Sequence, residues 1–219
     1  MTAKSFSFDS YILKGMSYAV YVDLIKDLLS EGKTTGVNQS DELVAYAKLN
    51  LQRMERLHKT IVINPDLEAA VKKISTPQTW LCITEGWCGD AAQNLPLFDK
   101  LASINNNITV KFVLRDENLD LIDRYLTNGG RAIPRVICIE NGTELWQWGP
   151  RPKLMQEKVL EYKNNPDFSH EEFVIQLHTW YAHNKTVALQ EELLQLLQDK
   201  LLQLLKDKTS QGVTNNFGE

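Results

Sequence analysis

The sequence predicts an α/β fold in which helices sandwich a central mixed β-sheet and further helices extend from both ends. Two apolar segments of strand length flank a helical segment between residues 79 and 114, which indicates a βαβ unit with parallel strands. Asn141-Gly142 joins two further apolar runs and favours an antiparallel hairpin, because both residues tolerate positive φ. With 219 residues, the chain exceeds a typical domain of roughly 150 residues, so we expect one core domain with extensions.

Residues 1–73 are expected to form a helical extension packed on the core. Apolar residues recur at helical spacing in the first helix. Ser40 predicts the start of a second helix and Asn64-Pro65 the start of a third, because serine and asparagine cap helices and proline suits the first helical position. The expected helices span about 16–29, 41–58 and 65–76.

Residues 74–163 are expected to form the core domain. Strands and helices alternate along it, and Pro134 opens the first strand of the hairpin. The expected strands span 79–84, 109–114, 135–140 and 144–148, and the expected helices span 88–104 and 119–126, with a further helix that ends near 162.

Residues 164–208 are expected to form leucine-rich C-terminal helices, followed by a polar tail at 209–219. Ser169 and Glu172 form a capping-box pattern at the start of this region. Between residues 189 and 205, nine of seventeen residues are leucine, and apolar positions repeat at alternating spacings of three and four. Such a stripe is typical of a helix that packs on its own domain or of one that pairs with a second subunit. The second interpretation implies a homodimer through this helix.

Composition and charge narrow the partners and the compartment. The net charge is −4, with 24 basic and 28 acidic residues, which argues against binding nucleic acid or an anionic membrane. Three irregularly spaced cysteines make no disulfide framework, so we expect a reducing compartment. We find neither a signal-peptide-like apolar stretch nor about 18 consecutive apolar residues, and therefore expect a cytoplasmic protein. The histidines lack metal-ligand spacing, so we expect neither a metal nor a cofactor.

Cys88 is the residue most suited to chemistry. It lies where a predicted strand passes into a predicted helix, so unpaired backbone N–H groups are expected to point toward its sulfur. These N–H groups and the helix dipole favour the thiolate, which is the nucleophilic form. Asp90 opposes this effect if its carboxylate turns toward the sulfur, because a like charge disfavours the thiolate.

The region from about residue 74 to 162 resembles the thioredoxin superfamily. The resemblance is carried, in chain order, by Trp87-Cys88-Gly89, Pro96, Gly130-Arg131-Ala132-Ile133-Pro134, Asn141-Gly142 and Gly149. It implies a thioredoxin-like three-layer sandwich in which Cys88 is the attacking cysteine and Pro134 follows a cis peptide bond. It also implies that Ile133 and Pro134 hold an extended substrate beside the sulfur, with Trp87 as an apolar wall. The alternative is that Pro134 shapes a turn and Trp87 packs in the core.

Two positions depart from the family pattern. Ala91 stands where thioredoxins have the second, resolving cysteine, so no internal disulfide can form there. Cys82 stands where thioredoxins keep a buried carboxylate for proton transfer. Cys82 and Cys138 are expected to be buried apolar residues rather than redox partners. Any partner of Cys88 is therefore expected to come from another molecule, either a low-molecular-weight thiol or a disulfide of a client protein.

Three charged residues near the motif are further candidates. Glu85 and Asp90 are candidates for proton transfer or for tuning the thiolate, and Arg131 is a candidate contact for an anionic substrate. Each of them is also explained by an ordinary surface charge, solvated or ion-paired.

The sequence supports two functional hypotheses. In the first, the protein is a monothiol redox protein in which Cys88 forms mixed disulfides that an external thiol resolves. In the second, it is a catalytically inactive binding module for extended protein segments, consistent with the residues at positions 82 and 91. Whether the protein is an enzyme stays open at this point, and peroxide reduction by Cys88 alone is a weaker alternative.

Overall fold

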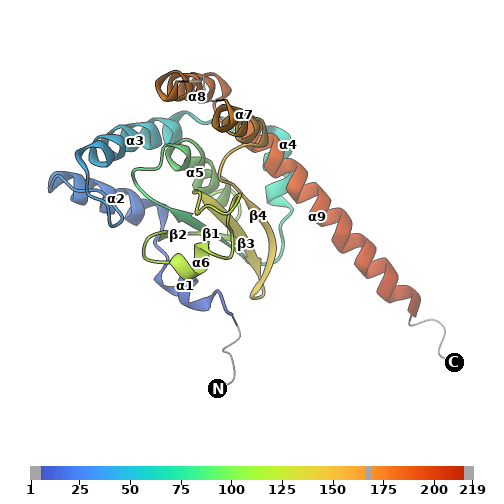
Figure 1. Cartoon of the computed structure of the whole chain (residues 1–219). Coiled ribbons are helices and arrows are strands. Elements are labelled where there is room, and N and C mark those ends of the chain that lie inside the picture. Colours follow the sequence, from blue (N-terminus) through green and yellow to red (C-terminus); the bar gives the residue numbers. More distant parts are fainter. Residues whose placement is uncertain (1–5, 166–168, 215–219) are drawn as a thin grey trace.

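The computed structural model describes residues 6–165 and 169–214, and it contains a four-stranded sheet with helices around it (Figure 1). The strands are β1 (Gln78–Thr84), β2 (Ile108–Leu114), β3 (Arg135–Glu140) and β4 (Thr143–Trp148). The helices are α1 (Asp9–Lys14), α2 (Tyr18–Ser30), α3 (Asp41–Thr60), α4 (Pro65–Lys72), α5 (Gly89–Ala102), α6 (Leu119–Ile122), α7 (Lys153–Asn164), α8 (His170–Asn184) and α9 (Val187–Thr214).

The sheet has the order β2-β1-β3-β4 and is mixed, as the sequence predicts. The strands β1 and β2 are parallel and are connected through α5, which confirms the βαβ unit. The strand β3 is antiparallel to both β1 and β4. Asn141 and Gly142 join β3 to β4 with φ values of 51° and 77°, which are the positive angles expected of this hairpin turn. This arrangement confirms the predicted α/β fold class.

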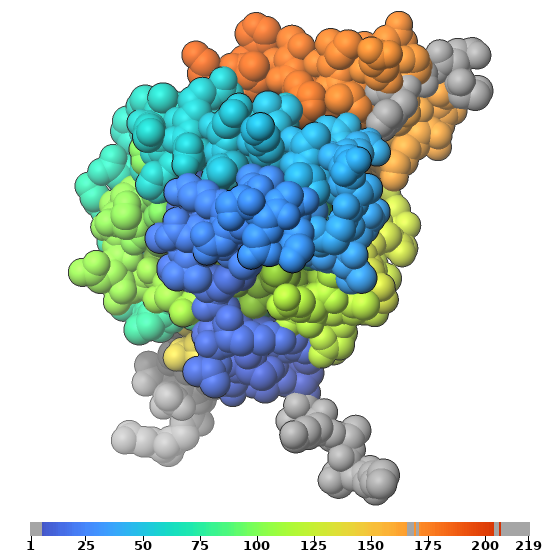
Figure 2. Space-filling model, turned by 90° about the vertical axis from the view of Figure 1, so that its left-hand side faces the viewer, coloured from blue at the N-terminus to red at the C-terminus, as the bar shows by residue number. Residues whose placement is uncertain are grey.

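Helices from the N-terminal segment pack directly on the sheet and on α5. The helix α3 lies along α5, and α1 and α2 contact β2. In the space-filling view, α2 and α3 (blue to light blue) cover much of one face, and α8 (orange) lies across its top (Figure 2). Because α3 and α8 approach the same end of α5, segments from both ends of the chain meet near the start of that helix.

Three predicted helix starts are confirmed by their capping hydrogen bonds. The Ser40 side chain accepts from the Leu43 N–H, and the Asn64 side chain accepts from the N–H groups of residues 66 and 67. The Ser169 side chain accepts from the Glu172 N–H at the start of α8. These contacts satisfy donors that a helix start otherwise leaves unpaired.

The N-terminus differs from the prediction of one helix from residue 16. Met16 is extended and exchanges two backbone hydrogen bonds with Phe112 of β2, each 2.8 Å long, so α2 begins only at Tyr18. The short helix α1 precedes this bridge. Sheet pairing therefore interrupts the helical apolar pattern at Met16.

At the other end, α9 remains helical through Thr214, well into the segment that we expected to be a polar tail. The remaining residues of that tail, 215–219, lie outside the described part of the chain. Within that part, no helix, α9 included, combines the length and the apolar character needed to span a membrane.

Candidate functional site

The strand order brings Cys88 against the loop before β3. Cys88 follows β1 and is the N-cap residue of α5. The strand β3 runs antiparallel beside β1, with Ile83 opposite Arg135, so the loop that enters β3 lies beside the end of β1. The Cys88 Sγ donates to the Ile133 carbonyl oxygen at 3.3 Å, and the Ile133–Pro134 peptide bond is cis. The sulfur is thus in contact with the residues expected to hold a substrate.

Gly149 closes the site behind Pro134. It has a φ of 120°, and a Cβ atom at this position would lie 2.2 Å from the Pro134 carbonyl oxygen. Side chains rarely adopt this backbone conformation, and here there is also no space for one. A residue other than glycine would therefore push the end of β4 away from the loop that contacts Cys88.

The environment of Cys88 opposes thiolate formation. The residue is only 8% exposed, and burial, followed by the charge of Asp90, raises the pKa of its thiol to about 12. The Ala91 N–H, 3.5 Å from the sulfur, and the Arg151 cation act in the opposite direction. The expectation of a thiolate favoured by the helix start is therefore wrong for this conformation, because desolvation outweighs the helix-start donors.

Asp90 belongs to a buried polar group of four residues, which we call the Asp90 network: Asp90, Asn94, Arg151 and Tyr181. Arg151 donates to Asp90 Oδ2 through both Nε, at 3.0 Å, and a terminal nitrogen. The Tyr181 hydroxyl donates to Asp90 Oδ1 at 2.6 Å, and Asn94 Nδ2 donates to the Tyr181 hydroxyl at 3.1 Å. The carboxylate is thus fixed by a cation and by α8, and it stays close enough to the sulfur to act on its pKa.

Helices α3 and α8 cover the start of α5. Asn50 of α3 donates to the Gly86 carbonyl oxygen at 3.1 Å, and Arg53 donates to Asn50 at 2.9 Å. A second nitrogen of Arg53 lies 3.3 Å from Nδ1 of His178 on α8. Together with Tyr181, these contacts place α8 over the Cys88 loop, which explains the low exposure of the sulfur.

Glu85 lies at the same end of β1 but is anchored elsewhere. It is fully buried, and its Oε1 accepts from the Asp116 backbone N–H at 2.9 Å. Burial raises the pKa of this carboxyl, while the Thr35 hydroxyl and the Asp116 N–H counteract part of the increase. Glu85 is therefore tied to the loops around Thr35 and Asp116. Of the two candidate carboxylates, Asp90 is the one that acts on the Cys88 pKa.

Trp87 and Arg131 both lie near the surface. Trp87 is partly buried, and the guanidinium of Arg115 stacks over its ring at 4.9 Å. Arg131 makes a two-pronged ion pair with Asp123, at 2.6 and 2.9 Å, in which both side chains are about half exposed. The structure places Arg131 in the surface ion pair that was the alternative to an anion contact.

Comparison with known proteins decides the family. The sequence model described as Thioredoxin matches residues 36–165, which is more than half of the chain. The chain belongs to the thioredoxin family. No curated protein matches the sequence.

Solved structures show the same fold over nearly the whole chain. A Pseudomonas aeruginosa protein of unknown function has a TM-score of 0.61 and 16% sequence identity, with coverage of 89% of this chain and 98% of that one. An HIV epitope-scaffold has a TM-score of 0.58 and 18% identity, with coverage of 89% and 99% respectively. At these identities the likeness concerns the fold alone, and it extends to the helices outside the family match.

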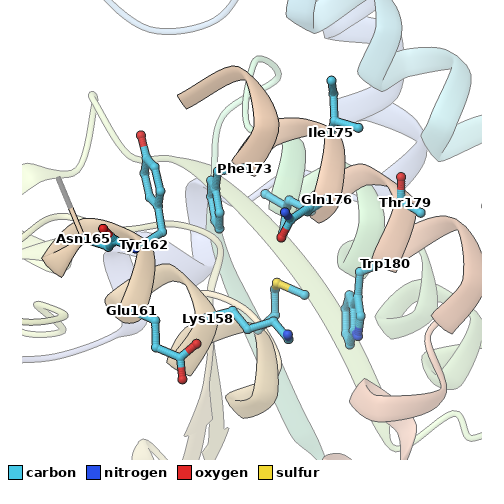
Figure 3. Close-up of a pocket in the computed structure, with 11 residues that line it drawn as sticks. Lys158, Glu161, Tyr162, Asn165, Phe173, Ile175, Gln176, Thr179 and Trp180 are labelled. Atoms are coloured by element: carbon cyan, nitrogen blue, oxygen red, sulfur yellow. The ribbon is translucent and has the colours of Figure 1, made fainter. Parts of the chain in front are cut away.

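One cavity in this member of the thioredoxin family lies away from the cysteine. It has a volume of about 600 Å³ and is formed between α7 and α8 (Figure 3). Its lining residues include Met155, Lys158, Phe173, Ile175 and Trp180. Cys88 is not among them, so α8 contributes to this cavity and, through His178 and Tyr181, to the cover over the thiol. Among the residues that the structure describes, no cluster of histidine, cysteine and carboxylate side chains could hold a metal ion.

Sequence reasoning missed Arg151 and Tyr181. Arg151 lies two residues after Gly149, which had been placed beside the active site by resemblance, so the Gly-Pro-Arg-Pro segment offered a usable signal. Tyr181 gave no such signal, because it is 91 residues away from Asp90 along the chain. Only the packing of α8 brings the two residues together.

Proposed function

We propose that this thioredoxin-family protein carries out thiol–disulfide exchange through Cys88 alone, as a monothiol redox protein. The observation that carries the proposal is the contact between the Cys88 sulfur and the Ile133 carbonyl oxygen, immediately before cis Pro134. The Ala91 N–H adds a donor to the same sulfur. This arrangement fits a cysteine that receives an extended substrate along the Ile133–Pro134 loop, with Trp87 at its side.

The exchange would proceed in two steps, and both conserve atoms and electrons. Cys88 loses its proton to solvent, and its thiolate attacks one sulfur of a disulfide. A new bond to Cys88 forms, the disulfide bond breaks, and the second sulfur leaves as a thiolate. An external thiolate then attacks the partner sulfur of this mixed disulfide, which releases the Cys88 thiolate and a new disulfide. Ala91 makes the external thiol necessary, because it cannot resolve the mixed disulfide.

Burial implies that the reaction requires a more open state than the one described. With a pKa of about 12, Cys88 is protonated near neutral pH, and its sulfur is shielded by the α8 cover. Displacement of α8 would hydrate the sulfur and move Tyr181 away from Asp90. Ionisation of the thiol would then cost less, because desolvation is the largest cause of its raised pKa.

The proposed partners are a low-molecular-weight thiol or the disulfide of a client protein, in the cytoplasm. Nucleic acid and membranes are not part of this proposal, in keeping with the net charge of −4. No residue is assigned to cofactor binding.

Incubation with oxidised glutathione at neutral to mildly alkaline pH tests the proposal. We expect a mixed disulfide on Cys88, detected by intact mass and peptide mapping. Cys82 and Cys138 are both fully buried and act as internal controls that should stay unmodified. The Cys88→Ser variant should give no adduct. If wild-type protein forms no adduct with Cys88 while an added model thiol reacts, the redox function is refuted.

A binding module for extended protein segments is the second candidate. The specific observation in its favour is that Cys88 is enclosed and protonated while Ala91 and Cys82 replace two groups used in thioredoxin turnover. In this case, the Cys88→Ser variant should bind extended peptides as tightly as the wild type, as measured by calorimetry. Loss of peptide binding in this variant would instead favour the redox function.

A further inference from the structure

An apolar groove lies beside α9 where this helix leaves the rest of the protein. It has a volume of about 360 Å³ and is bounded by α4, by the β4 edge of the sheet and by one side of α9. The apolar residues that line it include Ala69, Ala70, Leu145, Trp146, Leu194 and Leu197. Its rim carries both acidic and basic side chains, among them Asp66 and Lys73. The groove is therefore narrow, largely apolar and suited to an apolar helix.

The distal half of α9 is an apolar helix without cover from the body of the protein. Beyond the groove, α9 projects away from the other elements (Figure 1). Leu201, at the end of the groove, is 51% exposed, and Leu202 is 56% exposed. The sequence continues with leucine at positions 204 and 205. By contrast, Leu189 and Leu193 at the start of α9 are buried against the body.

We infer that two copies of this chain form a dimer in which the distal half of each α9 lies in the groove of the other copy. One copy cannot fill its own groove, because α9 is one continuous helix that carries its distal half away from it. A two-fold axis fills both grooves in one step, as expected of an isologous interface. The exposed leucines supply the apolar surface that the groove accommodates.

The geometry requires the two α9 helices to be antiparallel. The groove lies along the first part of α9, so a parallel partner would place its distal half beyond the groove, next to the other distal half. Its proximal half could not enter, because that half is already packed on its own body. The charges agree with this orientation, since α9 carries Glu191 and Glu192 near its start and Lys206 and Lys208 near its end. Antiparallel pairing brings these opposite charges together.

Sedimentation equilibrium of the full chain tests the dimer. We expect a mass of twice the 25.1 kDa of one chain for the wild type, and a single-chain mass for the Leu201→Glu and Leu202→Glu variants with unchanged circular dichroism. The matched control is Leu13→Glu, which alters a leucine that is 88% exposed on α1 and should leave the dimer intact. A wild type that stays at the single-chain mass up to its solubility limit would overturn the inference.

Spin labels distinguish the proposed arrangement from a parallel coiled coil. With the two-fold axis near Gln198, a label on a cysteine at position 210 lies about 18 Å from the axis, at about 1.5 Å per residue. The two labels of an antiparallel dimer should therefore be on the order of 36 Å apart, against about 10 Å for parallel helices in contact. Labelling in a Cys88→Ser background avoids a second site. The short distance would refute groove exchange even if a dimer forms.

Discussion

Asp90 and Arg151 act on the Cys88 thiol in opposite directions, although they are paired with each other. The negative charge of Asp90 raises the pKa of the thiol, and the positive charge of Arg151 lowers it. The ion pair therefore largely cancels its own effect on the sulfur. Burial remains as the largest cause of the raised pKa.

The Asp90→Asn substitution should lower the Cys88 pKa from about 12, because it removes the like charge and leaves Arg151 unbalanced beside the sulfur. Each unit of decrease raises the thiolate fraction about tenfold at a pH below the pKa. The rate of iodoacetamide alkylation as a function of pH measures the shift. Asp123→Asn, which removes a surface carboxylate paired with Arg131, is the control and should leave the profile unchanged. An unaltered or higher pKa in Asp90→Asn would contradict this account.

Gly149 offers a test of how tightly the loop before β3 is fixed. A Cβ atom would lie 2.2 Å from the Pro134 carbonyl oxygen, so Gly149→Ala should lower the free energy of unfolding by about 3 kcal/mol. Gly142 also has a positive φ, but its Cβ would meet open space. Gly142→Ala should therefore cost only about 1 kcal/mol. Urea denaturation compares the two variants, and equal losses would show that the contact with Pro134 contributes little.

Elements whose ends are set by local chemistry were predictable from the sequence. The caps at Ser40, Asn64 and Ser169 each bind N–H groups of the next few residues, and the Asn141-Gly142 turn depends only on its own φ angles. The short helix α1 was missed. It is six residues long and has no side-chain cap, so its stability depends on contacts with distant parts of the chain.

At the scale of elements, α8 controls access to the thiol. Tyr181→Phe removes the hydroxyl that donates to Asp90 and accepts from Asn94, so it should weaken the contact between α8 and the start of α5. We expect faster alkylation of Cys88, together with a loss of about 1 kcal/mol in unfolding free energy.

A control on the same helix is His183→Ala, whose side chain is exposed and bonds only within α8, to the Thr179 carbonyl oxygen. It should alter neither rate nor stability by a comparable amount. If Tyr181→Phe and His183→Ala alkylate at the same rate as the wild type, α8 does not limit access to Cys88.

For the whole molecule, buried thiols make stability depend on pH in the alkaline range. Burial raises the pKa of Cys88 to about 12 and that of Cys82 well above its ordinary value, whereas both thiols ionise near ~8.5 in the unfolded chain. Between these values the unfolded chain has lost protons that the folded chain retains, so stability falls as pH rises. Below about pH 8.5 the contribution is fully present.

Urea denaturation at pH 7.5 to 10 should thus show a decline of up to about 1.4 kcal/mol per pH unit for each buried thiol that titrates. Buried tyrosines such as Tyr21, whose pKa burial also raises, begin to contribute above about pH 10. The Cys82→Ala variant should show a shallower decline than the wild type. An unchanged slope in this variant would mean that the Cys82 thiol is not protected in the folded state.

The sequence predicted the sheet and the contact partners of Cys88 better than it predicted the state of the thiol. The position of Cys88 at the start of α5 and its approach to Pro134 follow from strand order and a motif within about fifty residues. The raised pKa depends on desolvation, and that depends on α3 and α8, which lie far from Cys88 in the sequence. No local pattern at Cys88 encodes their packing.

The order in which these parts occur along the chain has a consequence for synthesis on the ribosome. The residues that place the sulfur against Pro134 are complete once Gly149 has emerged, whereas Tyr181 comes 91 residues after Asp90. During translation, the nascent chain therefore contains an assembled thiol site before the helix that shields it exists. In that interval Cys88 is open to oxidants and to other nascent thiols, and completion of the last third of the protein ends this exposure.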